Sequence, residues 1–253
     1  MPAATLARFV LLEARRSGLP WLALACIVVV AGLAGFLAQV ALTESRALQA
    51  AVVAAFLRAA AVFLVAAHVA SSTLREINDK GLEHMLSLPL SRATQYLGRL
   101  AGYAACSAVL AAAFALPLLL WSPPAAVALW GVSLALECAL VAAAALFFAM
   151  TLVQAVPAIA ATAGLYLLAR SLSAIQAIAT GPLTEPSLAT DAARWALAGV
   201  SFLLPRLEGV ARTEWLLYGL PAAGPYLAAL AGVALYGAVL AAAGLFDFYR
   251  KSL

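Results

Sequence analysis

Long apolar runs separated by short polar segments make up most of this chain. Six runs are long enough to cross a bilayer, because a helix that spans about 30 Å of hydrocarbon needs roughly 20 residues. Lipid offers no partners to backbone N–H and C=O groups, so each run is expected to be helical. The pattern predicts an all-α, polytopic integral membrane protein, one domain over residues 1–253, with six transmembrane helices at residues 19–42, 47–70, 97–121, 125–152, 156–180 and 222–246.

Composition supports this class of protein. Apolar residues make up 66% of the chain and charged residues 10%, and the mean hydropathy is +1.03. Soluble domains have about 45–50% apolar and about 25% charged residues. Three arginines precede the first apolar run, as in a secretory signal, but that run is too long for a signal core, so we expect a retained helix. The three cysteines lie inside apolar runs, where a thiol acts as a small hydrophobe, and predict neither a disulfide nor a metal site.

Lysines and arginines near the ends of the predicted helices indicate the orientation. If the N-terminus is cytoplasmic, the inner side carries nine basic residues and the outer side four, so both termini are expected inside. The inner set is Arg8, Arg15, Arg16, Arg75, Lys80, Arg92, Arg99, Arg250 and Lys251, and the outer set is Arg46, Arg194, Arg206 and Arg212.

Two connections are much longer than the others. The outer one, residues 181–221, is rich in proline, glycine and charge, and its apolar piece at residues 195–204 is too short to cross a bilayer. It predicts re-entrant or interfacial helices, with Trp195, Trp215 and Tyr218 at headgroup level. These helices would anchor the loop, form an outer gate or dock a periplasmic partner.

The inner connection, residues 74–92, interrupts the chain with charge. It can continue the second predicted helix past the membrane surface as far as Ser87, because proline first occurs at Pro89, which disfavours helix just before it. Ser91 can then cap the helix that leads into the third span. From chemistry alone, this segment is either an ordinary solvated loop that sets topology or a docking surface for a partner.

The order of residues here resembles a known family. Glu76, Gly81-Leu82-Glu83, the run at 86–92 and Leu97-Gly98-Arg99 are similar to the signature of exporter-type (type-2) permeases of ATP-binding-cassette transporters. The resemblance implies that residues 74–92 form a cytoplasmic coupling helix that docks on an ATPase, and that residues 1–18 form an N-terminal connecting helix. The coupling residues would be Arg75, Glu76, Asp79, Lys80, Gly81, Glu83, His84, Pro89 and Arg92.

The chain lacks the G-x-x-x-x-G-K-[ST] phosphate loop of a nucleotide site. It is therefore expected to be a permease without catalytic residues or a cofactor of its own, and ATP and magnesium would bind a separate cytoplasmic ATPase. The resemblance further implies a second permease, as a homodimer or heterodimer, in a bacterial inner membrane. Membrane lipid and a periplasmic accessory protein are further expected contacts, whereas no nucleic-acid partner is predicted.

Three charged residues fall near the middle of predicted spans. A charge at the centre of a bilayer costs about 2.5–3.5 kcal/mol on insertion scales, so such groups usually face the bundle interior and pair. We expect Glu137 to pair with Arg58 or Arg170, leaving one positive charge for an anionic headgroup or a partner subunit. Alternatively, Arg58 lies nearer the interface and extends its head group to water.

These features leave several functions open. The leading interpretation is export of a lipid, drug or other amphipathic molecule, driven by ATP hydrolysis on the partner chain. A mechanotransmission permease, which drives a periplasmic or membrane partner without carrying solute, is a variant of it. An ion-coupled secondary transporter would be supported only by the intramembrane charges, and an intramembrane enzyme is disfavoured because the chain has only two histidines.

Overall fold

A computed structural model of the chain confirms the all-α class. Among the residues it describes, six helices are long and apolar enough to cross a membrane: Leu19–Gln39, Arg46–Asn78, Arg92–Leu120, Pro124–Leu152, Ala155–Leu172 and Ala223–Arg250. We therefore treat the chain as a multi-pass membrane protein. The described residues are 2–40, 45–79, 91–179, 194–195, 197, 199–201 and 204–250.

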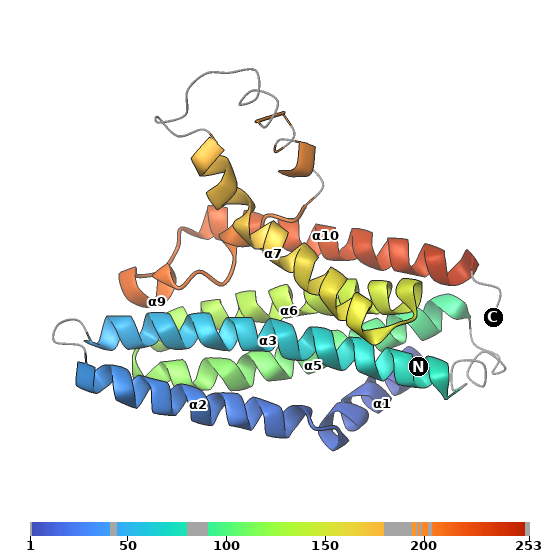
Figure 1. Ribbon diagram of the computed structural model, residues 1–253, viewed down its shortest axis with the longest axis horizontal. Coiled ribbons are helices and arrows are strands. Elements are labelled where there is room, and N and C mark those ends of the chain that lie inside the picture. The colour runs from blue at the N-terminus through green and yellow to red at the C-terminus, as the bar shows by residue number, and fades with distance from the viewer. Residues whose placement is uncertain are drawn as a thin grey trace.

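Most of the long helices lie along the long axis of the molecule, whereas the helix of residues Ala155–Ala179 crosses them obliquely (Figure 1). In chain order the described elements are α1 (Pro2–Arg16), α2 (Leu19–Val40), α3 (Ser45–Asn78), α5 (Arg92–Ala115), the 3-10 helix η1 (Leu116–Leu120), α6 (Pro124–Leu152), α7 (Ala155–Ala179), the 3-10 helix η2 (Leu207–Gly209), α9 (Glu214–Tyr218) and α10 (Ala223–Arg250).

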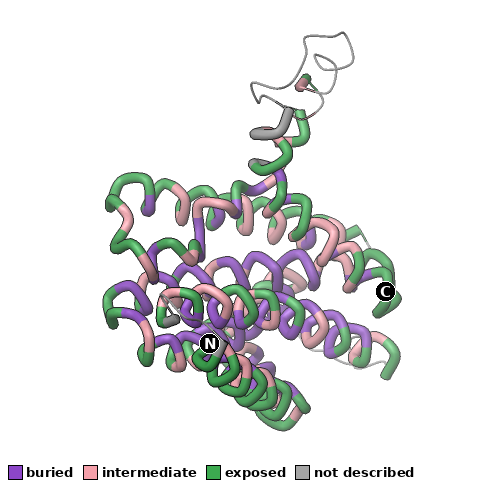
Figure 2. The backbone as a smooth tube through the Cα atoms, turned by 60° about the vertical axis from the view of Figure 1, so that its left-hand side comes forward, coloured by how far each residue is buried: buried purple, intermediate pink, exposed green. Residues whose placement is uncertain are grey.

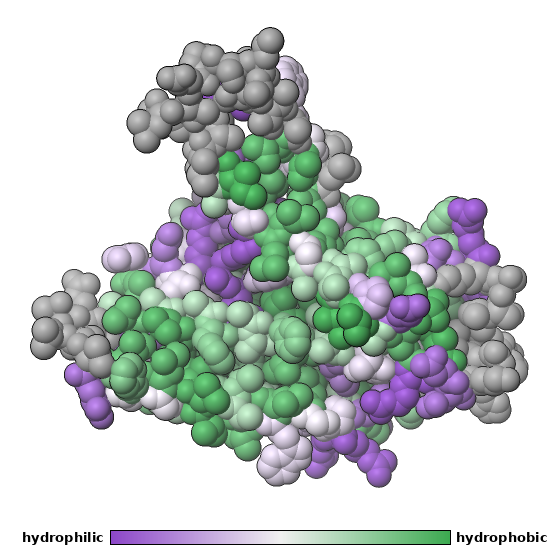
Figure 3. Space-filling view, in the orientation of Figure 1, coloured by the Kyte–Doolittle hydropathy of each residue, from purple (hydrophilic) through white to green (hydrophobic). Residues whose placement is uncertain are grey.

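Helix α6 is the centre of the bundle. It packs against α3, α5, α7 and α10, and its buried residues run almost continuously from Leu140 to Leu146. By contrast, α2 and α10 bury only narrow stripes and expose most of their apolar side chains (Figure 2). Apolar surface covers the middle of the long axis, and polar side chains gather toward its ends (Figure 3). This distribution is the one expected when lipid surrounds the bundle.

The third predicted span is not one regular helix. Helix α5 ends at Ala115, and η1 continues the chain to Leu120. Pro117 stands in the first turn of η1, and a proline cannot donate the backbone hydrogen bond that an α-helix would need there. A short turn joins α6 to α7, with Val153 in the left-handed conformation at φ 52°.

At both ends of residues 74–92, the predicted coupling segment, the structure describes helix, while the predicted continuation to Ser87 lies outside the described residues. Helix α3 extends beyond its apolar part to Asn78. Ser91 caps α5, where its side-chain oxygen accepts a hydrogen bond from the backbone N–H of Thr94 at 3.2 Å. Residues 80–90, which join these two ends, lie outside the described residues, as do the first 13 residues of the predicted outer loop.

The N-terminal helix α1 packs along α5. Its buried face is formed by Leu6, Val10 and Ala14, which recur every four residues and therefore share one side of the helix. Two glycines of α5 make the close approach possible. A methyl group added at Gly102 would lie 2.7 Å from Cβ of Val10, and one at Gly98 would lie 3.0 Å from Cβ of Leu6.

This packing makes a prediction for glycine substitutions. We expect Gly102→Ala to lower the free energy of unfolding by about 1–3 kcal/mol, because the added methyl group meets α1 and must push it away. Gly32→Ala in α2 is the matched control, since a Cβ there meets nothing within 4 Å. Unfolding titrations in detergent should separate the two variants. Equal stability of both would contradict the tight α1–α5 contact.

Candidate functional site

A buried ion pair joins α3 and α5 at the end of the bundle where the undescribed segment connects them. Nη1 of Arg99 lies 2.6 Å from Oε2 of Glu76, and the two side chains are 6% and 18% exposed. Glu76, which the sequence suggested as a coupling residue, therefore faces α5. It fixes the two helices relative to each other only a few residues from residues 80–90.

A chain of hydrogen bonds near this ion pair reaches α1. The hydroxyl of Tyr103 donates to Oγ of Ser72 at 3.1 Å, and Ser72 donates to the carboxylate of Glu13 at 2.8 Å. We call Glu13, Ser72, Glu76, Arg99 and Tyr103 the end network. It connects α1, α3 and α5 through polar contacts, and such contacts are most stable where water is excluded and every group has a partner.

Helix α10 meets the same end of the bundle. The guanidinium of Arg92 donates to the backbone carbonyls of Phe248 and Tyr249, at 3.3 and 3.2 Å. A cation beside the last carbonyls of a helix is favourable because those oxygens carry partial negative charge. Tyr96, one turn further along α5, packs against Gly244, where an added methyl group would overlap its hydroxyl.

The remaining predicted coupling residues fall into two groups. Arg75 and Asp79 are exposed at the end of α3. The others lie outside the described residues: Lys80, Gly81, Glu83, His84 and Pro89. Of the nine, the structure thus places Arg75, Glu76, Asp79 and Arg92 around one end of the bundle.

The three intramembrane charges also come together. Glu137 of α6 is fully buried, and Nη1 of Arg170 in α7 lies 3.7 Å from its carboxylate. Arg58 of α3 and Tyr166 of α7 are close enough to act electrostatically on Glu137. The distance from Arg170 is too long for a good hydrogen bond, so the attraction between the two groups is mainly one of charge.

Both arginines direct their hydrogen bonds to the backbone of the outer connection. Arg170 donates to the carbonyls of Leu207 and Val210, the latter at 2.9 Å, and Arg58 donates to the carbonyl of Ala211 at 2.9 Å. We call Arg58, Glu137, Arg170 and these carbonyls the mid-bundle cluster. Its carbonyl partners could not be foreseen from the sequence, because backbone acceptors have no residue signature.

Residues 207–211 consist of the 3-10 helix η2 and two irregular residues that follow it against the helices. Leu207, Val210 and Ala211 are buried, and Ala211 adopts the left-handed conformation at φ 48°. Non-helical backbone is tolerated at membrane depth only where it is buried in protein or lines a water-filled cavity. The two arginines donate to the carbonyls of Val210 and Ala211, and Arg170 adds a second donor to the Leu207 carbonyl, which already accepts from the N–H of Val210.

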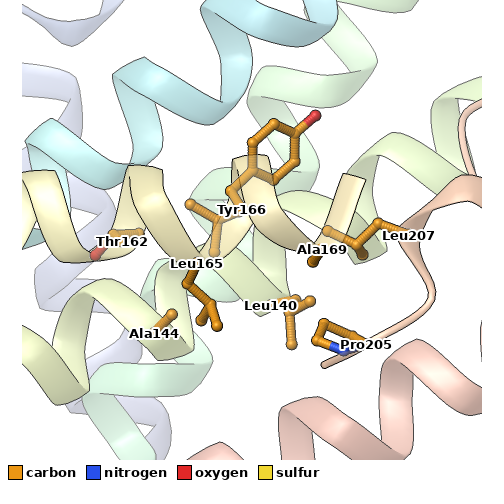
Figure 4. Close-up of a pocket in the computed structure, with 9 residues that line it drawn as sticks. Leu140, Ala144, Thr162, Leu165, Tyr166, Ala169, Pro205 and Leu207 are labelled. Carbon is orange, nitrogen blue, oxygen red and sulfur yellow. The ribbon is translucent and has the colours of Figure 1, made fainter. Parts of the chain in front are cut away.

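The seam between α6 and α7 beneath this segment is closely packed. Figure 4 shows the cavity there, lined by Leu140, Ala144 and Leu165 and covered by Pro205 and Leu207. Its volume is about 10 Å³, which is about the space that one water molecule needs. The seam therefore offers no room for a solute.

The outer connection packs inward more than the sequence suggested. Trp215 of α9 is buried and meets the ring of Tyr226 edge-on, with centroids 5.3 Å apart. Trp195 and Tyr218 are exposed, as residues at headgroup level would be. In the part of the chain that the structure describes, no three His, Cys, Asp or Glu side chains gather as metal ligands would.

No protein-family model matches this sequence, and a search of curated proteins returns no significant match.

The end network makes a first prediction. Glu76→Ala should lower the free energy of unfolding by about 2 kcal/mol. This loss is smaller than that for breaking a fully buried ion pair, because the Glu76 side chain is partly exposed. The double variant Glu76→Arg/Arg99→Glu should recover at least half of this loss. Arg75→Ala, an exposed neighbour, is the control and should change little. Unfolding titrations in detergent measure all three, and a double variant no more stable than Glu76→Ala would contradict the pair.

The mid-bundle cluster makes a second prediction. The native cysteines are first removed, and Val210→Cys is then introduced. Because Val210 is fully buried, the new thiol should react only slowly with a membrane-impermeant maleimide. Adding Arg170→Gln removes the charge that binds the 207–211 backbone, and labelling should rise about ten-fold as the segment opens more often. Arg206→Gln, at an exposed arginine of the same connection, is the control. Unchanged labelling with Arg170→Gln would exclude this anchoring role.

Proposed function

We propose that this chain is the permease subunit of an exporter-type ATP-binding-cassette transporter, and that residues 74–92 receive the motion of a separate cytoplasmic ATPase. The observation that carries the proposal is the Glu76–Arg99 pair. It joins α3 to α5 directly beside residues 80–90, whose sequence resembles the family's coupling helix. A load applied to that segment would therefore move two transmembrane helices as a unit.

The end network extends the transmission path. Glu13 connects α1 to α3 through Ser72, and Arg92 connects the start of α5 to the end of α10. Four helices thus meet at the end where the ATPase would dock. In this scheme ATP and magnesium bind the ATPase, and the permease converts its closure into a helix displacement.

Helix α3 connects this end to the mid-bundle cluster. Arg58 and Glu76 are 18 residues apart, which is about five turns and about 27 Å along one face of the helix. A rigid shift or rotation of α3 would act directly on the hydrogen bond between Arg58 and the carbonyl of Ala211. ATPase closure would in this way reach the outer connection, which would serve as the outer gate.

The proposed cargo is an amphipathic molecule such as a lipid or drug. The apolar faces of α2, α7 and α10 remain exposed in the single chain, and a second permease would cover part of them and form the path between the two copies. The bacterial inner membrane is the proposed location. The arginines of the mid-bundle cluster bind backbone carbonyls, which favours an anchoring role for these charges over the ion path of a secondary transporter.

The test uses the exposed end of α3. Arg75→Glu/Asp79→Lys reverses two charges that lie outside the end network, so the fold should persist. We expect about ten-fold less of the cognate ATPase to co-purify, because like charges would then face each other across the interface. Arg46→Glu, an exposed arginine near the opposite end of the same helix, is the matched control and should leave co-purification unchanged.

ATPase-dependent transport in proteoliposomes provides the second readout. The double variant should lose transport together with binding, whereas the control should keep both. If no P-loop ATPase co-purifies with the unaltered permease, or if a cation gradient alone drives transport, the proposed class is wrong.

A further inference from the structure

We propose that a groove between α1, α2 and α5 is a binding site for an anionic phospholipid of the bilayer, with one acyl chain in the groove and the phosphate on Arg15. The groove has a volume of about 440 Å³. It is formed where the chain turns from α1 into α2, so that two walls come from consecutive helices and the third from α5.

The lining of the groove suits a hydrocarbon chain. Leu11 and Ala14 come from α1, Ala23 and Ile27 from α2, and Ala113 from α5. Small alanine side chains leave the space, and the larger aliphatic ones provide contact. Arg15 is the one charged residue among the described residues that line the groove, and it is exposed at the end of α1.

The charges around Arg15 indicate an anionic headgroup. Arg8 precedes Arg15 by seven residues, which places both guanidinium groups on one side of α1, about 10 Å apart along the helix. The only carboxylate of α1, Glu13, turns away and accepts a hydrogen bond from Ser72. The basic side of α1 therefore keeps its full positive charge, and a phosphate diester is the complementary group in a membrane.

Side chains near the turn between α1 and α2 indicate how deep in the bilayer the opening of the groove lies. Trp21, in the first turn of α2, is 75% exposed, and Phe9 and Leu12 on the outward face of α1 are 56% and 50% exposed. Tryptophan is enriched at the headgroup level, and a helix with basic and apolar outward residues lies in that layer. The mouth of the groove would thus open at the depth of the phosphates, with its floor toward the acyl chains.

Close packing keeps the groove open without a ligand. The contacts of Gly98 and Gly102 with α1 fix the distance between α1 and α5, and Ser17 stabilises the turn into α2 by accepting a hydrogen bond from the N–H of Leu19 at 3.2 Å. A lipid would therefore enter a formed site, which reduces the entropy lost on binding.

The experiment compares lipid retention by the full-length protein. The purified protein is mixed with equal amounts of phosphatidylglycerol and phosphatidylcholine, and retained lipids are counted by native mass spectrometry. The unaltered protein should prefer phosphatidylglycerol. Arg15→Gln should reduce that preference about five-fold, the effect expected for one basic residue at a membrane surface.

Two further variants separate this site from general charge attraction. Arg16→Gln removes the same charge from a neighbouring face of α1, about 100° round the helix, and should leave the preference within about two-fold, because Arg16 does not line the groove. Ala113→Phe fills the groove and should reduce retention of both lipids. Equal loss with Arg15→Gln and Arg16→Gln, or full retention with Ala113→Phe, would overturn the proposal. Since lipid binding needs no ATPase, either outcome leaves the proposed coupling role untouched.

Discussion

Every backbone polar group inside an apolar bundle needs a partner from the protein itself, and this constraint explains the most unusual contacts of the molecule. Helices meet it internally. Residues 207–211 form only a 3-10 turn and an irregular continuation, and Val210 and Ala211 are buried, so the carbonyls of these two residues depend on side chains that reach them from α3 and α7. Arg58 and Arg170 supply the donors, and Glu137 offsets part of their charge. Charge burial is thus a consequence of burying irregular backbone.

The same constraint shapes the end of the bundle where α3 and α5 leave the apolar region. Glu76, Arg99, Ser72 and Tyr103 are largely buried there, and each has a partner on another helix. Such contacts contribute modestly to stability, since desolvation offsets much of the attraction. Their larger effect is to define one register and one rotation for helices whose alanine-rich surfaces would allow many. A specified register is what a helix needs if it is to transmit displacement over its length.

The helices differ in how much of their surface is buried by other helices, and their structural roles differ accordingly. Helix α6 is buried on most sides and forms the centre about which α3, α5, α7 and α10 pack. Helices α2 and α10 present broad apolar faces to the outside. Helix α1 belongs to both environments, because Gly102 draws one side of it onto α5 while its arginines remain outside. The groove beside Arg15 exists because a short helix is attached firmly at such a boundary.

Local sequence determined the elements, and only the tertiary structure determined how they pair. Hydropathy identified all six long helices, Pro89 and Ser91 indicated where α5 begins, and the depth of Arg58, Glu137 and Arg170 indicated that they pair. These features depend on composition and on neighbours within a few residues. The choice of Arg170 as the nearer partner, the inward direction of Glu76 and the carbonyl partners of both arginines depend on how each helix is rotated. Helices that are apolar on all sides carry no stripe that sets this rotation, so it is decided by packing between residues as far apart as Arg58 and Ala211.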